Sequence, residues 1–233
     1  MANTKNFISV VMSTYNNETT IEKSLLSILN QTYQNFEILL MDDGSTDNTY
    51  KLCQKISKNF DKIKIYQNIK NLGLTKSLNF LINKSVGNLI ARSDADDLSE
   101  KNRFEIQLEY LYKNDLDACT TRAYEIGTKR IIPGLSYYIP AKYLINYKNP
   151  FIHGTLFIKK DVLKAINLYD ESFIYAQDYK LMSDLLKRNY KISIIKEPLY
   201  HLNTKNNIST IYSKEQKYYA NCVRNNVIPI EKA

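Results

Sequence analysis

Glycine and long hydrophobic runs are both scarce in this sequence. Only 6 of the 233 residues are glycine, about 3% where average proteins have about 7%, so the place of each glycine is informative. No stretch reaches the roughly 18 apolar residues of a membrane-spanning helix, and no secretory signal pattern opens the sequence, so we expect neither a span nor a leader. At 44% hydrophobic, the chain can still bury a sizeable core, which excludes a wholly disordered or fibrous protein.

Cysteine is also rare, and the acidic residues are outnumbered. Cys53, Cys119 and Cys222 are far apart and odd in number, which gives neither a zinc spacing nor a disulfide framework and predicts buried, reduced thiols in a cytosolic protein. The 32 basic and 24 acidic side chains leave a net charge of +8. This excess suits a partner with phosphates, whether a nucleotide, a nucleic acid or an anionic lipid surface, and does not choose among them.

Short apolar runs alternate with amphipathic stretches over the first two thirds of the chain. The runs predict strands at 7–12, 36–41, 63–66 and 88–91, and helical periodicity follows each of them, with Ser45 as the predicted N-cap of the second helix. This alternation predicts an α/β fold with a mainly parallel sheet, in which ligands bind beyond the carboxyl ends of the strands.

The later part of the chain is less regular. The stretch 125–150 is rich in tyrosine and punctuated by proline, so we interpret it as a long irregular segment that faces an acceptor. Regular structure is predicted to resume with strands at 154–158 and 191–195 and a helix at 179–188 between them.

Carboxylates follow predicted strands at three places. Asp42–Ser45 is by itself best interpreted as a turn and helix cap. Asp94, Asp96 and Asp97 repel one another unless a cation neutralises them, and a hard divalent cation such as Mg²⁺ or Mn²⁺ fits oxygen ligands. The alternative for this cluster is a solvated acidic turn that caps a helix beginning near Ser99. The third place is Asp178.

Polar and basic groups lie between these carboxylates. Asn71, Gly73 and Lys76 stand at the start of a predicted helix, where phosphate binding is favourable; an ordinary glycine turn with a solvated lysine explains them about as well. Arg92 precedes the aspartates and can serve as their counter-ion.

Together these motifs resemble the family 2 glycosyltransferases, which have the GT-A fold, over about residues 6–202. The segments that carry the resemblance are Val10–Asn16, Asn30–Tyr33, Phe36–Ile38, Asp42–Asp47, Asn71–Leu74, Ser77–Asn79, Ile90–Asp97 with Arg103 and Gln107, His153–Thr155 and Gln177–Leu181. Several motifs in the family's order are far more specific than any one of them. Near the end, Leu199–His201 and Asn207–Ser209 follow the family's usual ending only loosely.

The resemblance implies a Rossmann-like, nucleotide-sugar-binding half, 1–115, and an acceptor-binding half of the same domain, 116–233. In the first half it implies a uridine site, a continuation of the donor site and a metal site for Mn²⁺ or Mg²⁺. The uridine site would be Ser13, Thr14, Tyr15 and Asp43; the donor site would continue through Asn71, Gly73 and Lys76; Asp94 would hold the ribose and the metal, and Asp96 would be the firmest metal ligand. The family often has Pro at Ser13, and its usual Arg is Leu78 here, which leaves Lys76 nearest for the diphosphate.

In the second half the resemblance implies a catalytic carboxylate and acceptor contacts. Asp178 would be the general base, with Gln177 beside it where the family often has Glu. His153 lies in an acceptor-side motif, so a role there and a structural role stay equally open, whereas His201 is interpreted as structural.

The implied function is that of a metal-dependent, inverting hexosyltransferase. It would move sugar from a nucleotide diphosphate sugar, UDP-hexose or UDP-N-acetylhexosamine, to a glycan or lipid-linked acceptor of a bacterial surface polysaccharide. We expect a cytoplasmic protein with peripheral contact to the inner membrane. A nucleotidyltransferase acting on a sugar phosphate is the alternative, although the first turn, Ser13–Asn16, lacks the glycine-rich phosphate loop of that class. A nucleic-acid-binding module ranks last, because the lysines are spread along the chain instead of clustered. The sequence does not specify the sugar, the acceptor, the linkage or the oligomeric state.

Overall fold

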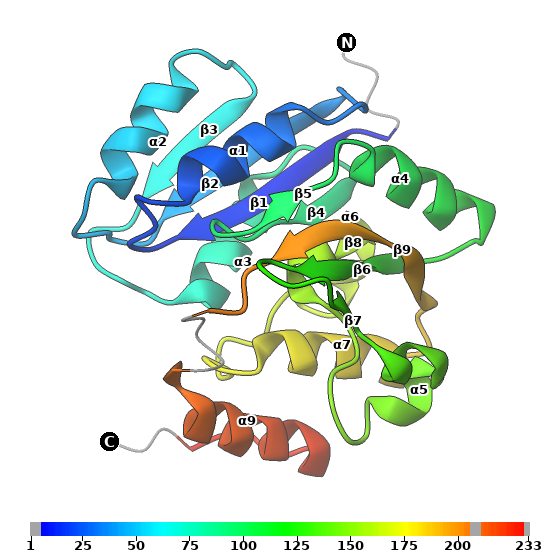
Figure 1. Ribbon diagram of the computed structural model, residues 1–233. Coiled ribbons are helices and arrows are strands. Elements are labelled where there is room, and N and C mark those ends of the chain that lie inside the picture. Colours follow the sequence, from blue (N-terminus) through cyan, green and yellow to red (C-terminus); the bar gives the residue numbers. More distant parts are fainter. Residues whose placement is uncertain (1–5, 206–210, 231–233) are drawn as a thin grey trace.

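The structure is a computed structural model that describes residues 6–205 and 211–230. The expectations placed on the first five residues and on Asn207–Ser209 lie outside these ranges. The predicted α/β fold is confirmed, with a central sheet flanked by helices on both faces (Figure 1). The first elements are β1 (Ile8–Thr14), α1 (Ile21–Leu29), β2 (Phe36–Asp42), α2 (Thr49–Ser57), β3 (Ile63–Gln67), α3 (Leu74–Lys84), β4 (Leu89–Arg92), β5 (Leu98–Ser99) and α4 (Arg103–Lys113).

The second half contributes shorter elements to the same sheet. They are β6 (Ala118–Glu125), β7 (Ile131–Ile132), the 3₁₀ turn η1 (Leu135–Tyr138), α5 (Ala141–Leu144), the 3₁₀ turn η2 (His153–Thr155), β8 (Phe157–Lys159), α6 (Lys160–Ala165), α7 (Gln177–Lys187), β9 (Ile192–Leu202) and α9 (Ser213–Asn225). The strand order is β3-β2-β1-β4-β8-β6-β9-β5, with β7 paired to β6. One sheet therefore runs through both halves of the chain.

The first four strands pair in parallel, and their register brings the future site together. Thr14 at the end of β1 lies opposite Asp42 at the end of β2, which in turn lies opposite Gln67 at the end of β3. The strand β8 pairs antiparallel with both β4 and β6, whereas β6 and β9 are parallel to each other. The residues that follow β1 and β2 are thus placed at one edge.

Alternating strand residues build two cores, one on each face of the sheet. Val10 and Met12 of β1 pack on α1, α2 and α4, whereas Val11 between them packs on the face covered by α3, α6, α7 and α9. Because successive strand side chains point to opposite faces, an almost wholly apolar strand is the pattern of a sheet covered on both sides. All three cysteines are buried and free, as predicted.

Two local predictions were wrong, and the alternative given for the acidic turn does not match the structure either. Ser45 does not cap α2, which begins at Thr49 after Asn48; its Oγ instead accepts a hydrogen bond from the Asn16 N–H at 3.0 Å. The acidic turn Asp94–Asp97 does not cap a helix either, since it runs into β5 and α4 begins only at Arg103. The strand expected at 154–158 is shorter, because residues 153–155 form η2. Tertiary contacts engage both Ser45 and the acidic turn, and local capping propensity does not predict such contacts.

Candidate active site at the carboxyl ends of the strands

The turn after β1 contains three of the predicted donor-site residues. Thr14 is buried and its hydroxyl hydrogen-bonds to Asn17 Oδ1 at 3.1 Å, while the Tyr15 N–H donates to the same oxygen at 3.2 Å. Ser13 is partly buried, and the Tyr15 ring is 44% exposed. Asn17 thus holds the turn from within, Ser45 holds it through the Asn16 N–H, and the exposed Tyr15 ring can cover a planar ligand.

Asp43 links this turn to the loop before α3. Its N–H donates to the Thr14 carbonyl at 2.8 Å. Its buried carboxylate accepts from Asn68 Nδ2 at 2.7 Å and from the N–H groups of Leu72 and Gly73, both at 2.9 Å. A carboxylate offers about four lone-pair positions. After these three bonds, one position remains for an N–H or O–H of a ligand.

Gly44 allows that loop to come close. Its φ is +76°, and a Cβ there would lie 2.6 Å from the carbonyl carbon of Lys70, so only glycine fits. Gly73, with φ +92°, precedes α3, and its N–H also donates to Asn71 Oδ1 at 3.0 Å. Lys76 is exposed in the first turn of α3. Residues 71–73 thus form a short loop whose backbone N–H groups point at the Asp43 carboxylate.

The acidic turn after β4 is held from below by a buried arginine and a buried tyrosine. Arg92, 1% exposed, forms an ion pair with Asp94 Oδ1, so its interpretation as a counter-ion is what the structure shows. The Asp94 N–H donates to the hydroxyl of Tyr200, a fully buried residue of β9, at 2.9 Å. The other carboxylate oxygen of Asp94 accepts no hydrogen bond from the residues that the structure describes.

Asp96 and Asp97 have different environments. Asp97 is buried; it accepts the Asn203 N–H at 2.6 Å and a hydrogen bond from Tyr200, and burial together with Asp94 and Asp96 raises its pKa to about 8. Asp96 is partly exposed and accepts a side-chain hydrogen bond from Asn203 Nδ2 at 3.2 Å; burial and the neighbouring Asp94 raise its pKa as well. Asp97 is therefore a structural member of the turn, whereas Asp96 is the open one.

The available oxygens fit a hard divalent cation. Asp94 and Asp96 each keep a carboxylate oxygen that accepts no hydrogen bond from another side chain in the part of the chain that the structure describes, and their mutual repulsion is what a cation would relieve. Within the described ranges no three His, Cys, Asp or Glu side chains gather around one point. The protein offers a pair of ligands, and Mg²⁺ or Mn²⁺ held by one or two carboxylates takes its remaining ligands from water and phosphate.

The loop around Gly154 packs directly on this turn. A Cβ at Gly154 would lie 2.6 Å from Asp94 Oδ2 and 2.7 Å from the Tyr200 hydroxyl. The fully buried Arg103 donates to the Gly154 carbonyl at 2.9 Å and to the Arg92 carbonyl at 3.1 Å. Burial lowers the pKa of Arg103 to about 10, so it stays charged at neutral pH. Arg103 therefore links the end of β4 to the loop that contains Gly154.

Asp178 lies in the first turn of α7, as the sequence predicted. Ala176 before the helix is in the left-handed region, with φ +52°. Asn149 donates through Nδ2 to Asp178 Oδ2 at 2.7 Å. Gln177 Oε1 is buried without a hydrogen-bond partner in the described part of the chain. The helix start thus presents a carboxylate with one oxygen free and an amide oxygen that lacks a donor.

His153 lies between the two sets of carboxylates. Its Nε2 hydrogen-bonds to the buried Tyr169 hydroxyl at 2.7 Å. Burial and Arg92 lower its pKa to about 4, although Asp178 and Asp94 act in the opposite direction. The imidazole is therefore neutral at physiological pH. Both carboxylates are therefore near enough to this one ring to act on its pKa.

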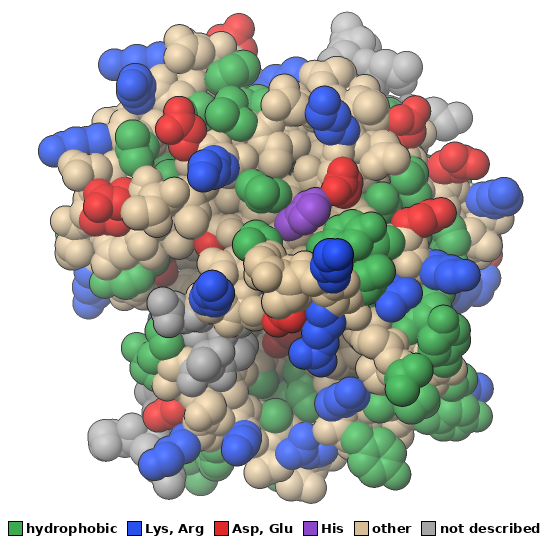
Figure 2. All heavy atoms as spheres, in the orientation of Figure 1, with side chains coloured by type: hydrophobic (Ala, Val, Ile, Leu, Met, Phe, Trp, Pro, Cys, Tyr) green, Lys and Arg blue, Asp and Glu red, His purple; other side chains and the backbone are tan. Residues whose placement is uncertain are grey.

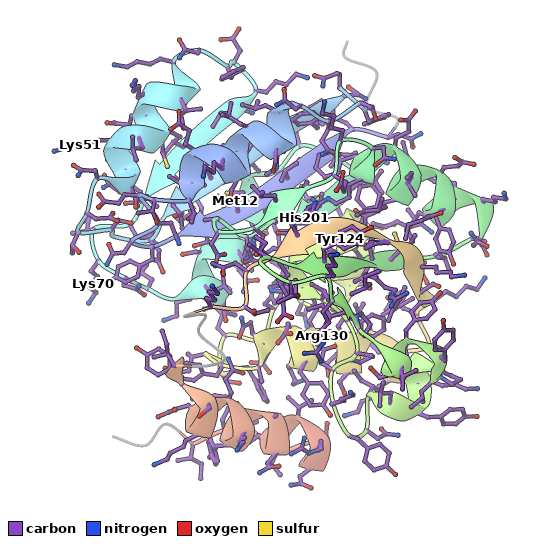
Figure 3. All side chains as sticks on the ribbon, viewed as in Figure 1. Met12, Lys51, Lys70, Tyr124, Arg130 and His201 are labelled. Carbon is purple, nitrogen blue, oxygen red and sulfur yellow. The ribbon has the colours of Figure 1, made fainter. Side chains whose placement is uncertain are left out.

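The molecule is hollowed between the central sheet and the layer formed by α7 and α9, and acidic side chains are visible in that hollow (Figure 2). His201 lies elsewhere: it stacks near Tyr124, with ring centroids 5.3 Å apart, and hydrogen-bonds to Glu100 at 2.6 Å (Figure 3). These contacts match its interpretation as structural.

No helix in residues 6–205 or 211–230 is long and apolar enough to span a bilayer.

Five contributors to the site were missed by sequence reasoning. They are Asn17, Asn68, Asn149, Tyr200 and Asn203, each of which holds one of the predicted residues. Asn68 stands just after a predicted strand and could have been found by that rule. Asn17 lies in the turn that it holds, which follows another predicted strand, and the same rule covers it. Asn149, Tyr200 and Asn203 act from segments that only the tertiary fold brings near, and no local signal marks them.

The sheet, its helices and the carboxylates at its strand ends define a transferase of the GT-A type. The chain belongs to the family described as "Glycosyl transferase family 2", which residues 9–167 match. It is 33% identical over 184 residues, or 78% of this chain and 70% of the relative, to the Escherichia coli UDP-Glc:alpha-D-GlcNAc-diphosphoundecaprenol beta-1,3-glucosyltransferase WfgD.

Two solved structures show the same fold. Staphylococcus aureus TarS 1–349, in complex with UDP-GlcNAc, has a TM-score of 0.72 at 21% identity over 86% of this chain. The mannosyltransferase PcManGT from Pyrobaculum calidifontis, in complex with GDP-Man and Mn²⁺, has a TM-score of 0.77 at 18% identity over 97% of it. This chain spans 59% of the first of these chains and 65% of the second.

Proposed function

We propose that this glycosyltransferase moves a hexose or N-acetylhexosamine from its UDP derivative to a hydroxyl of a glycan or lipid-linked acceptor, with inversion. The observation that carries the proposal is that one carboxylate from each proposed half of the site lies near the same side chain, His153. Asp94 belongs to the donor side and Asp178 to the acceptor side, and both act on the ring of His153. WfgD, which has a UDP-sugar donor and a lipid diphosphate acceptor in its name, supports both substrate classes.

The donor would lie along the ends of β1, β2 and β4. We assign the uracil and ribose to the turn of Ser13, Thr14 and Tyr15 and to Asp43, which keeps one acceptor position. The ribose would also contact Asp94, and the diphosphate would pass the loop of Asn71 and Gly73, with the exposed Lys76 near it. The N–H groups at the start of a helix favour an anion there.

Asp94 and Asp96 would hold Mn²⁺ or Mg²⁺, with Asp96 as the firmer ligand because Asp94 is already paired with Arg92. When bound, the ion stabilises the charge that develops on the diphosphate leaving group. The Mn²⁺ complex of PcManGT supports a divalent ion in this fold. Asp97 keeps the turn in shape through Tyr200 and Asn203.

Asp178 would act as the general base. Its carboxylate takes the proton from an acceptor hydroxyl as that oxygen bonds to the anomeric carbon and the bond to the diphosphate oxygen breaks. This single displacement inverts the anomeric centre, and a positioned base contributes roughly 10² to 10⁴ in rate. Asn149 orients the carboxylate, and the unpartnered Gln177 Oε1 could accept a second acceptor hydroxyl. We assign His153 to the acceptor side as a neutral imidazole.

The acceptor would belong to a surface polysaccharide under construction at the cytoplasmic face of the inner membrane. Family membership favours glycosyl transfer over the nucleotidyltransferase alternative. The split between 1–115 and 116–233 remains part of this proposal as the division between donor and acceptor halves.

A donor screen tests this function. The protein is incubated with UDP-glucose, UDP-galactose, their N-acetylated forms and GDP-mannose, with Mn²⁺ or with EDTA, and nucleoside diphosphate release is followed with and without lipid-linked glycan acceptors. We expect metal-dependent UDP release from one UDP-sugar, increased by an acceptor. Release from GDP-mannose alone would overturn the donor assignment, and full activity in EDTA would overturn the metal requirement.

A further inference from the structure

The segment that follows β6, through β8 to the first residue of α6, has an unusual charge composition. From residue 126 to residue 160 the sequence contains no Asp or Glu. Its basic side chains are Lys129, Arg130, Lys142, Lys148, Lys159 and Lys160. In a chain with 24 acidic residues, an acid-free stretch of this length is a concentrated positive region, and such a region attracts anionic partners.

The same segment exposes large apolar and aromatic side chains. Leu135 is 87% exposed, Tyr147 75% and Tyr138 69%, and Ile139 and Tyr143 are also about half exposed or more. We call residues 126–148 the 126–148 surface. In Figure 2 the lower right part, where Figure 1 places α5, carries mixed hydrophobic and Lys/Arg side chains and no acidic ones in that view. Exposed apolar groups in such number mark an interaction surface.

This surface leads directly into the acceptor side of the site. Its last residues run into Asn149, whose amide donates to Asp178 at 2.7 Å. The backbone of Tyr147 is fixed from the other side, because Arg224 of α9 donates to its carbonyl at 2.9 Å. A partner that binds the 126–148 surface would therefore lie beside the place where the acceptor must enter.

We propose that the 126–148 surface docks the protein on a bilayer with anionic headgroups, so that a lipid-linked acceptor reaches Asp178 from that bilayer. Tyrosine rings favour the membrane interface, and lysine and arginine favour anionic headgroups. Leu135 and Ile139 favour a lipid partner over a nucleic acid, since aliphatic side chains gain by burial among acyl chains and have no counterpart along a phosphate backbone. The inference rests on the proposed acceptor class but concerns a different surface.

The test is co-sedimentation with vesicles of mixed phosphatidylglycerol and phosphatidylcholine. Lys142→Glu/Lys148→Glu changes the 126–148 surface, and Lys51→Glu/Lys55→Glu on α2 is the matched control at the opposite end of the molecule, where Figure 3 labels Lys51. Each pair lowers the net charge of +8 by four, to +4. A basic side chain at an anionic surface contributes roughly fivefold to binding, so we expect at least a tenfold loss for the first pair and a much smaller one for the control.

A second comparison tests the apolar part. Tyr138→Ser should weaken vesicle binding severalfold, whereas Tyr112→Ser on α4, an equally simple loss of an exposed ring, should not. Equal losses from the two charge pairs, or no binding to the anionic vesicles by the wild-type protein, would overturn the docking surface.

UDP binding by calorimetry in solution separates this inference from the proposed function. All four variants should bind UDP as the wild type does. Vesicle binding without any nucleotide binding would instead refute the donor site and leave the surface standing.

Discussion

The proposed donor and acceptor halves hold their key carboxylates in different ways. Asp43 on the donor side is fixed by two backbone N–H groups and one amide, all from the loop next to it in space. Asp178 on the acceptor side is held by one side-chain amide, Asn149, at the end of a segment built from very short elements. The comparison indicates that the Asp43 carboxylate is fixed more firmly than the Asp178 carboxylate.

The two halves are nevertheless joined at one point. The acidic turn after β4 belongs to the donor half, yet Tyr200 and Asn203 from the end of the chain's last strand fix it. Arg103 adds a second tie through the Gly154 carbonyl. We expect a change in either half to affect the step assigned to that half, except where these contacts join the two.

The largest effect is expected at the metal. Asp96→Ala should lower transfer by a factor on the order of 10³ or more, because charge stabilisation at the leaving group is worth several kcal/mol. Its melting temperature should stay the same or rise slightly, since removing Asp96 relieves repulsion with Asp94. Asp61→Ala, on the loop before β3, is the control and should keep full activity. Metal-dependent activity that survives in Asp96→Ala would refute its role as the main ligand.

A donor-only effect is expected at Asp43. Asp43→Ala should weaken UDP binding by about 1–3 kcal/mol, because a ligand N–H and the loop N–H groups all lose their acceptor. Unfolding in urea should also begin at lower denaturant, since three hydrogen bonds to a buried carboxylate disappear. Calorimetry with UDP and Mn²⁺ measures the affinity. An unchanged affinity would place the nucleotide away from Asp43.

A change at Tyr200, in the proposed acceptor half, should alter the acidic turn after β4 in the proposed donor half. Tyr200→Phe removes the hydroxyl that accepts from the Asp94 N–H and bonds Asp97. Leaving two buried groups without this partner should cost about 1–2 kcal/mol of stability, and the Mn²⁺ concentration for half-maximal activity should rise. Tyr112→Phe on α4 is the control. An unchanged Mn²⁺ requirement would mean that the turn does not depend on this contact.

A further effect concerns the pH dependence of stability. The pKa of His153 is lowered from 6.5 to about 4, so between these values the unfolded chain binds a proton that the native protein does not. Stability should therefore fall as pH drops from 6.5 towards 4, by at most about 1.4 kcal/mol per pH unit from this group, and should not change through it above 6.5. Chemical denaturation of His153→Gln should show a shallower slope in this window, whereas His201→Gln should retain it. Equal slopes for wild type and His153→Gln would contradict the shift.

Sequence reasoning succeeded where a site residue follows its own strand. Asp43, Asp94 and Asp178 were placed at strand ends or a helix start, and the structure has them there, because those positions follow from local periodicity. Ser45 shows the limit: a good capping residue bonds instead to the turn after β1. Tyr200 and Asn203 were not foreseen, because more than 100 residues separate them from the turn that they hold and only the antiparallel pairing of β5 with β9 brings them close.

The most direct test of the division between halves is Asp178→Asn, with UDP release and UDP affinity measured on the same preparation. Asparagine keeps the shape and the contact with Asn149 but cannot take a proton. The account predicts that kcat falls by roughly 10² or more while UDP affinity stays within about twofold. Asp184→Asn, further along α7, should change neither quantity. Near wild-type kcat in Asp178→Asn would contradict its assignment as the base, and a parallel loss of UDP affinity would contradict the separation of the two halves.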